Sequence, residues 1–398
     1  MKSDALTVKT LGEICVDNKG TYGIAASAVD YNDELYTYLR ITDINDDGTL
    51  NYKDLKSVDD QNSYKYILKE NDIVFARTGN STGRSYFYDK RDGEFVYAGF
   101  LIKFGINPDI INPWYMKYYT KSTLYKNWVD SFNSGSTRGN INAQTYSKMP
   151  VYFPGREIQD KLVYFLNLID DKIKTNNKLN DNLEEITEIL FEQWFYKFEF
   201  FTEKEGTYKS SGGEFKDTTL GEIPMDFETG KMQQIIKFSN GKKRPDETGT
   251  TPLYGGNGIL DWVESSNYKN LIIIGRVGAY CGSLYIEPGR CWISDNAIAA
   301  IPKQSKNYYA YLLLKKYNLN NMHIGSSQPL LTQGILNSIE VVVPKETVIN
   351  KFNDMIEPIY RKIFQNRAEN ERLVLLRDTL IPKLMTGQIE LDNLDMEI

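Results

Sequence analysis

One loop pattern occurs twice in this chain of 398 residues, and it constrains the fold more than any other feature. Residues 72–87 read DIVFARTGNSTGRSYF, and residues 271–286 read LIIIGRVGAYCGSLYI. In both, a branched apolar run leads to an arginine that is followed by two spaced glycines. The residues that match at a constant offset of 199 positions are Arg77, Gly79 and Gly83 in the first copy, and Arg276, Gly278 and Gly282 in the second. Because ordered self-similarity indicates repeated structural units, the loop predicts a chain built twice.

Two further self-matches support the repeat. TLGEI at 10–14 recurs at 219–223, with an offset of 209. SGSTRGNINAQTYSKMPVYFP at 134–154 aligns with IGSSQPLLTQGILNSIEVVVP at 324–344, with an offset of 190, so that Ile141 matches Leu331 and Pro154 matches Pro344. Since the offset falls along the chain, we expect shorter loops in the second copy.

Each copy reads as a sheet domain followed by a long helix. Short β-branched and aromatic runs predict strands at 72–76, 151–153, 271–275 and 339–343, and apolar spacing predicts helices at 113–129 and 307–317. The expected organisation is a first sheet domain at 1–154, a central long helix at 155–200, a linker at 201–218, a second sheet domain at 219–344, and a C-terminal long helix with tail at 345–398. The sequence EKEGTYKSSGGEFKDTT at 203–219 predicts a flexible, exposed connection.

Both long helices carry apolar residues at spacings of three and four, which is typical of a coiled-coil seam. In the first helix, expected at 157–196, the seam is Ile158, Leu162, Phe165, Ile169, Ile173, Leu183, Ile186 and Leu190. In the second helix, which Pro382 is expected to end, it is Val348, Phe352, Met355, Ile359, Ile363, Leu373, Leu376 and Leu380. Asn176 and Asn180 match Asn366 and Asn370 in the middle of each seam, where a polar residue commonly fixes the register.

The helices are therefore expected to pair with each other. The residues expected to make this pairing are Ile169, Ile173, Asn176 and Leu183 of the first helix, and Ile359, Ile363, Asn366 and Leu373 of the second. An antiparallel pair would relate the two sheet domains by a pseudo-two-fold axis. The predicted fold class is α+β, with two pseudo-symmetric mixed α/β domains joined by an antiparallel coiled coil. The alternative is that each amphipathic helix lies on its own domain.

Composition narrows the class of protein. With 41% hydrophobic and 25% charged residues, the chain can bury a core, and it has no apolar run long enough for a membrane span. The N-terminus lacks the apolar core of a signal peptide, so we expect a cytoplasmic protein without membrane contact. The net charge of −6 taken alone disfavours nucleic acid, but the basic stretch KFSNGKKR at 237–244 contrasts with the acidic tail at 391–398.

The residues for common catalytic sites are missing. His323 is the only histidine, which removes HExxH metal sites, and the three cysteines form no CxxC pair. GNSTGRS at 79–85 has the wrong spacing for a P-loop, and NPW at 112–114 is explained by an asparagine N-cap with proline at the first helical position. We therefore expect the chain by itself to be no enzyme. The alternatives are a nuclease with a divergent carboxylate site and a two-headed scaffold for protein partners.

The sequence resembles the specificity (S) subunit of Type I restriction–modification enzymes. The resemblance covers essentially the whole chain and rests on the ordered repeat, the strand-and-glycine loops, and the helix start from Pro154 to Gln159. It rests also on the phrases LRITDI at 39–44, YGGNGI at 254–259 and LIPKLMTGQIEL at 380–391. The second helix start, PKETVIN at 344–350, departs from the family pattern because it lacks the glutamine.

The resemblance implies two target-recognition domains, each reading one half of a bipartite asymmetric sequence in double-stranded DNA. The paired helices would set the spacer between the half-sites and dock two methyltransferase (M) subunits, which restriction (R) subunits join in systems that cleave. No cofactor is expected on this chain. S-adenosylmethionine would serve the methyltransferase partners, and ATP and Mg²⁺ would serve the restriction partners. LRITDI has no counterpart in the second domain, so the two domains are expected to read different half-sites.

The candidate DNA-contacting residues lie in and beside the repeated loops. Arg77 and Arg276 can hold a phosphate, pin the domain internally, or read guanine through O6 and N7, and the sequence leaves these roles open. The other candidates of the first domain are Thr78, Gly79, Asn80, Ser81, Thr82, Arg84, Ser134, Ser136, Thr137 and Arg138. Those of the second are Lys242, Lys243, Arg244, Tyr254, Asn257, Ser326, Ser327 and Gln328. The lysine-rich stretch also fits a solvated turn.

Overall fold

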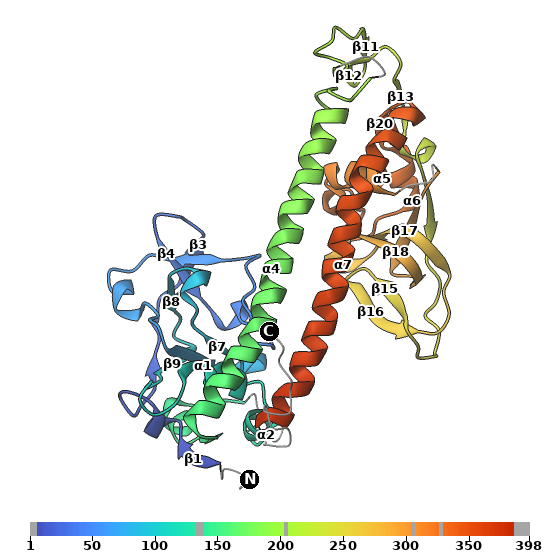
Figure 1. Cartoon of the computed structure of the whole chain (residues 1–398). Coiled ribbons are helices and arrows are strands. Elements are labelled where there is room, and N and C mark those ends of the chain that lie inside the picture. The colour runs from blue at the N-terminus through green and yellow to red at the C-terminus, as the bar shows by residue number, and fades with distance from the viewer. Residues whose placement is uncertain (1–5, 133–138, 203–205, 304–306, 326–328, 386–398) are drawn as a thin grey trace. The chain divides into compact units, whose positions relative to one another are not determined.

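The computed structural model describes residues 6–132, 139–202, 206–303, 307–325 and 329–385. The chain divides into two compact units, and the division falls inside both long helices (Figure 1). Unit 1 contains residues 1–175 and 368–398, and unit 2 contains residues 176–367. Each unit therefore holds one sheet domain together with one half of each long helix.

Unit 1 is built on two four-stranded sheets. The first has the order β2 (Thr21–Tyr22), β9 (Leu101–Gly105), β6 (Asp72–Ala76) and β7 (Ser85–Phe87). The second has the order β3 (Ala28–Asp30), β5 (Lys56–Val58), β4 (Tyr36–Leu39) and β8 (Phe95–Tyr97). The helices of its sheet domain are α1 (Pro113–Tyr119), α2 (Thr123–Asp130) and α3 (Ala143–Ser147), and its short 3₁₀ helices are η1 (Gly12–Ile14), η2 (Ile41–Asp43), η3 (Ser63–Tyr66), η4 (Gly79–Ser81) and η5 (Lys90–Asp92).

Unit 2 keeps the first of these sheets and extends it. Its six strands run in the order β14 (Ile236–Asn240), β19 (Ala297–Pro302), β17 (Tyr268–Gly275), β18 (Leu284–Ile293), β15 (Thr251–Gly255) and β16 (Gly258–Val263). The first four correspond to β2, β9, β6 and β7, since β6 and β17 both end at the repeated arginine. Its helices are α5 (Tyr308–Lys316) and α6 (Gln333–Ser338), with the 3₁₀ helices η6 (Met232–Gln234), η7 (Gly278–Tyr280) and η8 (Leu319–Asn321).

A two-stranded pair in each unit corrects one of the self-matches. β1 (Thr7–Thr10) pairs with β10 (Pro150–Phe153), and β13 (Glu228–Lys231) pairs with β20 (Glu340–Val343) in the same antiparallel register. The backbone N–H of Leu11 donates to the carbonyl of Met149, as that of Met232 donates to Ile339, each at 2.8 Å. The structural counterpart of TLGEI at 10–14 is therefore 231–235. The second TLGEI, at 219–223, lies in a different hairpin, and that sequence match is a coincidence.

That hairpin also corrects the expectation of a flexible linker. β11 (Phe215–Thr218), at the end of the segment expected to be flexible, pairs antiparallel with β12 (Gly221–Pro224), which follows that segment. The ring of Phe200 stacks on those of Tyr208 and Phe227, with centroids 4.8 and 5.2 Å apart. The glycines and serines of this segment predicted flexibility, but its aromatic residues bury enough surface to order the described part.

The predicted short helices are confirmed with one change. The helix expected at 307–317 is α5, whereas the one expected at 113–129 is broken into α1 and α2. Ser122 causes the break, because its side chain caps α2 by accepting the N–H of Tyr125. Asn112 caps α1 in the same way, with proline at the first helical position, as the sequence predicted.

The two long helices are α4 (Arg156–Phe195) and α7 (Glu346–Met385), and both are continuous (Figure 1). α7 passes through Pro382, so the expectation that this proline ends the helix was wrong. A proline in the last turn removes only one backbone hydrogen bond. Ile381, Leu384 and Met385 are buried in the core of unit 1, and this packing keeps the last turn helical.

Within each unit the helix segments pair antiparallel. In unit 1, Asp170 of α4 bonds Arg377 of α7, and Lys172 pairs with Glu369. In unit 2, the amide nitrogen of Asn366 donates to the amide oxygen of Asn180 at 2.8 Å in the buried seam. The predicted antiparallel pairing is confirmed, but the helices also join the domain cores, since Leu162 and Phe191 of α4 lie in those of units 1 and 2.

The burial of side chains corrects the seam at two equivalent positions. Ile186 and Leu376, expected in the seam, are each 45% exposed, and the neighbouring Thr187 and Arg377 are buried instead. Ile169, Asn176, Ile363 and Asn366 are buried as expected. The remaining predicted pairing residues, Ile173, Leu183, Ile359 and Leu373, are half-buried.

Candidate nucleic-acid interface

The two repeated loops have the same backbone. The N–H of Arg77 donates to the carbonyl of Phe100 at 3.1 Å, and its own carbonyl accepts the N–H of Ile141 at 2.9 Å. Arg276 does the same with Asn296 at 3.0 Å and Leu331 at 2.9 Å. The backbone of each arginine therefore joins the end of its strand to one of the two aligned segments, 134–154 in the first copy and 324–344 in the second. Ile141 and Leu331 are the corresponding residues.

The glycines of the loop are needed for its shape. Gly79 and Gly278 have φ of 71° and 70°, and Gly83 and Gly282 have φ of 89° and 86°. A side chain is disfavoured at such angles. A Cβ on Gly282 would also lie 2.5 Å from the backbone nitrogen of Asn320, whereas one on Gly278 would meet nothing within 4 Å. The second glycine thus allows close packing, and the first shapes the turn.

The side chains of the two arginines have different neighbours. The guanidinium carbon of Arg77 lies 5.0 Å from the ring centre of Tyr22, which is 41% exposed. One terminal nitrogen of Arg276 donates to the carbonyl of Asp295 at 3.2 Å. In both arginines Nε is buried without a hydrogen-bond partner. Among the described residues neither guanidinium pairs with a carboxylate, so the internal pin is not an ion pair.

Most other loop residues of the first domain are used inside the loop. The Thr82 hydroxyl lies 2.8 Å from the carbonyls of both Gly79 and Gly139, and Ser81 is buried. Arg84 pairs with Asp46, its Nε lying 2.6 Å from the carboxylate. Thr78 is half-buried and forms an isolated bridge with Asn140, so Asn80 is the exposed member of the set.

The candidates of the second domain divide in the same way. Lys242 and Lys243 are exposed beside the strand end that carries Asn296, while Arg244 forms an ion pair with Asp261. Asn257 is exposed in the turn between β15 and β16. Tyr254 is only 6% exposed, and its hydroxyl donates to Glu287 at 2.9 Å. Burial and the Glu287 carboxylate raise the pKa of Tyr254, and the structure places this side chain inside the domain.

Two exposed tyrosines beside the loops were not predicted from the sequence. Tyr22 supports Arg77 from β2, and no sequence signal connected these distant positions. Tyr280 is 50% exposed in η7 and corresponds to Ser81 in the first loop, so the aligned repeat could have identified it. The remaining candidates, Ser134, Ser136, Thr137 and Arg138 with Ser326, Ser327 and Gln328, lie outside the described residues. The described residues that follow these candidates in sequence lie beside the arginine loops, since Asn140 forms a bridge with Thr78 and Leu330 forms one with Val277.

Neither a metal site nor a membrane span was found in the part of the chain that the structure describes. No group of three or more histidine, cysteine or carboxylate side chains gathers closely enough there to hold a metal ion. No helix among those residues is both long and apolar enough to cross a membrane.

Comparison with known proteins gives a consistent family. The Type I restriction modification DNA specificity domain matches residues 4–185 and 224–369. The MjaIX specificity subunit of Methanocaldococcus jannaschii is 24% identical over 70% of this chain and 70% of its own length. The HindI specificity subunit of Haemophilus influenzae is 23% identical over 82% of this chain and 88% of its own.

A solved structure shares the fold. The S subunit of a Type I restriction–modification system from M. genitalium matches with a TM-score of 0.58 and 18% identity, over 96% of this chain and 97% of that one. Because the family model covers most of the sequence in two copies, the chain belongs to the Type I restriction–modification specificity subunits.

Proposed function

We propose that this chain is the DNA sequence-recognition subunit of a Type I restriction–modification complex. Each recognition domain, at 1–154 and 219–344, reads one half of a bipartite, asymmetric target. The observation that carries the proposal is the arginine loop. Its backbone conformation is the same in both domains, whereas the side chains around it differ. A shared frame with variable contacts is what two readers of different sequences require.

The arginines belong to the shared frame. With Nε buried, the terminal nitrogens of Arg77 form the outer edge of the guanidinium, and the ring of Tyr22 restricts its movement. Such an edge holds one phosphate oxygen pair or the O6 and N7 atoms of guanine. The exposed Asn80, Lys242, Lys243 and Asn257 differ between the domains and supply the contacts that differ between half-sites.

The paired helices α4 and α7 set the spacer and dock two methyltransferase subunits. The chain itself forms and breaks no bond. S-adenosylmethionine binds the methyltransferase partners, and ATP and Mg²⁺ serve restriction subunits where the system contains them. The target is double-stranded DNA in the cytoplasm.

Salt-dependent binding tests this proposal against a protein scaffold. The chain, purified with its methyltransferase partner, is mixed with random duplexes, and bound DNA is sequenced at several salt concentrations. We expect enrichment of a two-part motif and an affinity that falls steeply with salt, because each neutralised phosphate contributes a slope of about −0.9. Binding without sequence preference would favour the scaffold, and DNA cleavage by the isolated chain would favour a nuclease.

A further inference from the structure

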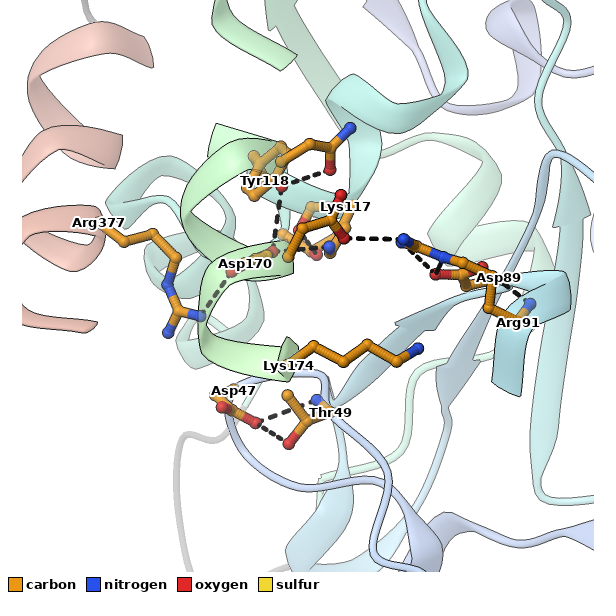
Figure 2. Close-up of polar contacts among 12 residues, drawn as sticks. Asp47, Thr49, Asp89, Arg91, Lys117, Tyr118, Asp170, Lys174 and Arg377 are labelled. Carbon is orange, nitrogen blue, oxygen red and sulfur yellow. Dashed lines mark hydrogen bonds and ion pairs between the residues drawn. The ribbon is translucent and has the colours of Figure 1, made fainter. Parts of the chain in front are cut away.

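A largely shielded carboxylate in unit 1 joins α4 to two other elements. Asp170 accepts from Arg377 of α7 at 2.9 Å and from the amine of Lys117 of α1 at 2.6 Å. The hydroxyl of Tyr118, also on α1, lies 3.0 Å from the same carboxylate and 2.7 Å from Asn167. Figure 2 shows Arg377, Lys117 and Tyr118 converging on Asp170. The Arg377 and Asp170 side chains are 5% and 14% exposed, so these contacts are largely shielded from water.

The same face of α4 makes a second set of contacts with the sheet domain. Asp171 accepts from Arg91 at 2.8 Å, and the amine of Lys174 lies 2.6 Å from Asp92. Arg91 and Asp92 belong to η5, and Asp89 fixes Arg91 by accepting from its Nε. Four side chains within two turns of α4, at 167, 170, 171 and 174, thus bond elements of the first recognition domain. Charge-assisted hydrogen bonds of this kind fix the orientation of the domain relative to α4, whereas apolar contacts allow the two surfaces to slide past each other.

The electrostatics support a preformed cluster. Burial alone would raise the pKa of Asp170, but the charges of Lys117 and Lys121 and the bonds from Lys117 and Arg377 hold it well below the ordinary value. Asp170 is therefore ionised at neutral pH. Arg377 also donates to Asp378 at 2.9 Å, so the arginine is held from both sides.

Unit 2 uses neutral groups at the matching positions. Tyr360 and Thr187 stand where the offset of 190 places the counterparts of Asp170 and Arg377. The ring of Tyr360 stacks on that of Tyr308 at 4.6 Å, and its hydroxyl bonds the Thr187 side chain. The charged pair at these two positions is thus specific to unit 1. In unit 2, ion pairs at other positions, Lys315 with Glu188 and Lys316 with Glu192, join α5 to α4.

We propose that Asp170 is the positioning residue that fixes the angle at which the first recognition domain is held on α4, and that this angle determines which spacer lengths the first half-site can be read with. The inference rests on the proposed function. Lys117 and Tyr118 carry the domain side of the attachment, and Arg377 carries the helix side. Removing them leaves the DNA-contacting loop intact but lets the domain rotate about apolar contacts.

The test reads the spacer directly. Cells express each variant with the methyltransferase partner, and single-molecule sequencing of their DNA gives the methylated motif with its spacer lengths. The variants are Asp170→Asn and Lys117→Met, and the control is Lys172→Met, which removes an exposed α4–α7 ion pair that does not touch the domain. We expect both test variants to keep the two half-sites and to raise methylation at spacers one base pair longer or shorter by roughly tenfold, which corresponds to about 1.4 kcal/mol of lost discrimination.

Each outcome decides a different question. An unchanged spacer distribution in both test variants, with the half-sites kept, would overturn the positioning role. No bipartite motif with the wild-type chain and an active partner would instead refute the proposed function. If Asp170→Asn fails to accumulate as folded protein, Lys117→Met decides alone, because it keeps the Asp170–Arg377 pair. A spacer change in the Lys172→Met control would also contradict the assignment to Asp170.

Discussion

At the scale of single residues, Arg77 and Arg276 have the same backbone contacts and different side-chain neighbours. Tyr22 holds the first guanidinium through its ring, and the carbonyl of Asp295 holds the second. A buried N–H without a partner costs free energy, and both arginines have one at Nε. Both domains carry this cost, which indicates a use for the terminal nitrogens of each guanidinium.

The two glycines of the second loop should differ in their response to alanine. Gly278→Ala adds only backbone strain and is expected to cost about 1 kcal/mol. Gly282→Ala adds a contact with the backbone of Asn320 and is expected to cost about 2 to 4 kcal/mol. Urea unfolding of the two variants measures both values. Equal losses would show that the close approach at Gly282 is relieved without cost.

Lys121 provides a test of pH dependence. Its partial burial lowers the pKa to about 8, with Arg377 and Lys117 adding to the shift and Asp170 opposing it. Between pH 8 and the ordinary value near 10.5, the unfolded chain binds more protons, so the stability of the wild-type chain should rise with pH in this window. Lys121→Met should therefore be stabilising by up to about 3 kcal/mol at pH 7, and the difference should vanish above pH 10.5.

Unfolding of both proteins at pH 7, 9 and 10.5 measures this difference. A difference that stays constant with pH would show that Lys121 is charged in the folded chain throughout.

At the scale of elements, the buried asparagines in the middle of the helix pair have opposite effects on two properties. They lower the stability of the pair and fix its register. Asn180 and Asn366 bond each other, and the amide oxygen of Asn366 has no hydrogen-bond partner. Replacing both with leucine should raise the melting temperature by several degrees, since it removes buried polar groups and adds apolar contact. The register should loosen at the same time, because leucines pair equally well after a shift by one heptad.

Thermal unfolding and disulfide trapping between cysteines placed on the two helices measure these effects. The single variant Asn366→Leu is the control, because it leaves Asn180 buried without this partner. A lower melting temperature in the double variant would contradict the interpretation.

The elements show what the sequence could predict. Spacings of three and four identified both long helices, and the internal repeat favoured their antiparallel pairing. The same spacings wrongly placed Ile186 and Leu376 in the seam. Thr187 and Arg377 are buried there instead, because each has a polar partner on the other long helix. The Asp170 cluster was also missed, since the partners of Asp170 come from two segments distant in sequence, α1 and α7. The second TLGEI shows that a five-residue identity without its surrounding register is weak evidence of structural equivalence.

At the scale of the whole molecule, two halves with one plan carry different details. The first domain adds a separate sheet of β3, β5, β4 and β8, while the second extends its main sheet with β15 and β16. Asp170 and Arg377 form an ion pair in unit 1, where the aligned residues of unit 2 are Tyr360 and Thr187. A duplicated frame with independent surfaces is suited to reading two different half-sites. Because the net charge is −6, contact with DNA phosphates must come from local basic groups.

The central claim is tested most directly by sequencing methylated bases in DNA from cells that express this chain with its methyltransferase partner. We expect a bipartite motif with methyladenine in both halves, which Arg77→Ala or Arg276→Ala abolishes while the protein stays folded. The absence of a bipartite motif with an active methyltransferase, or a motif unchanged by both substitutions, would contradict it.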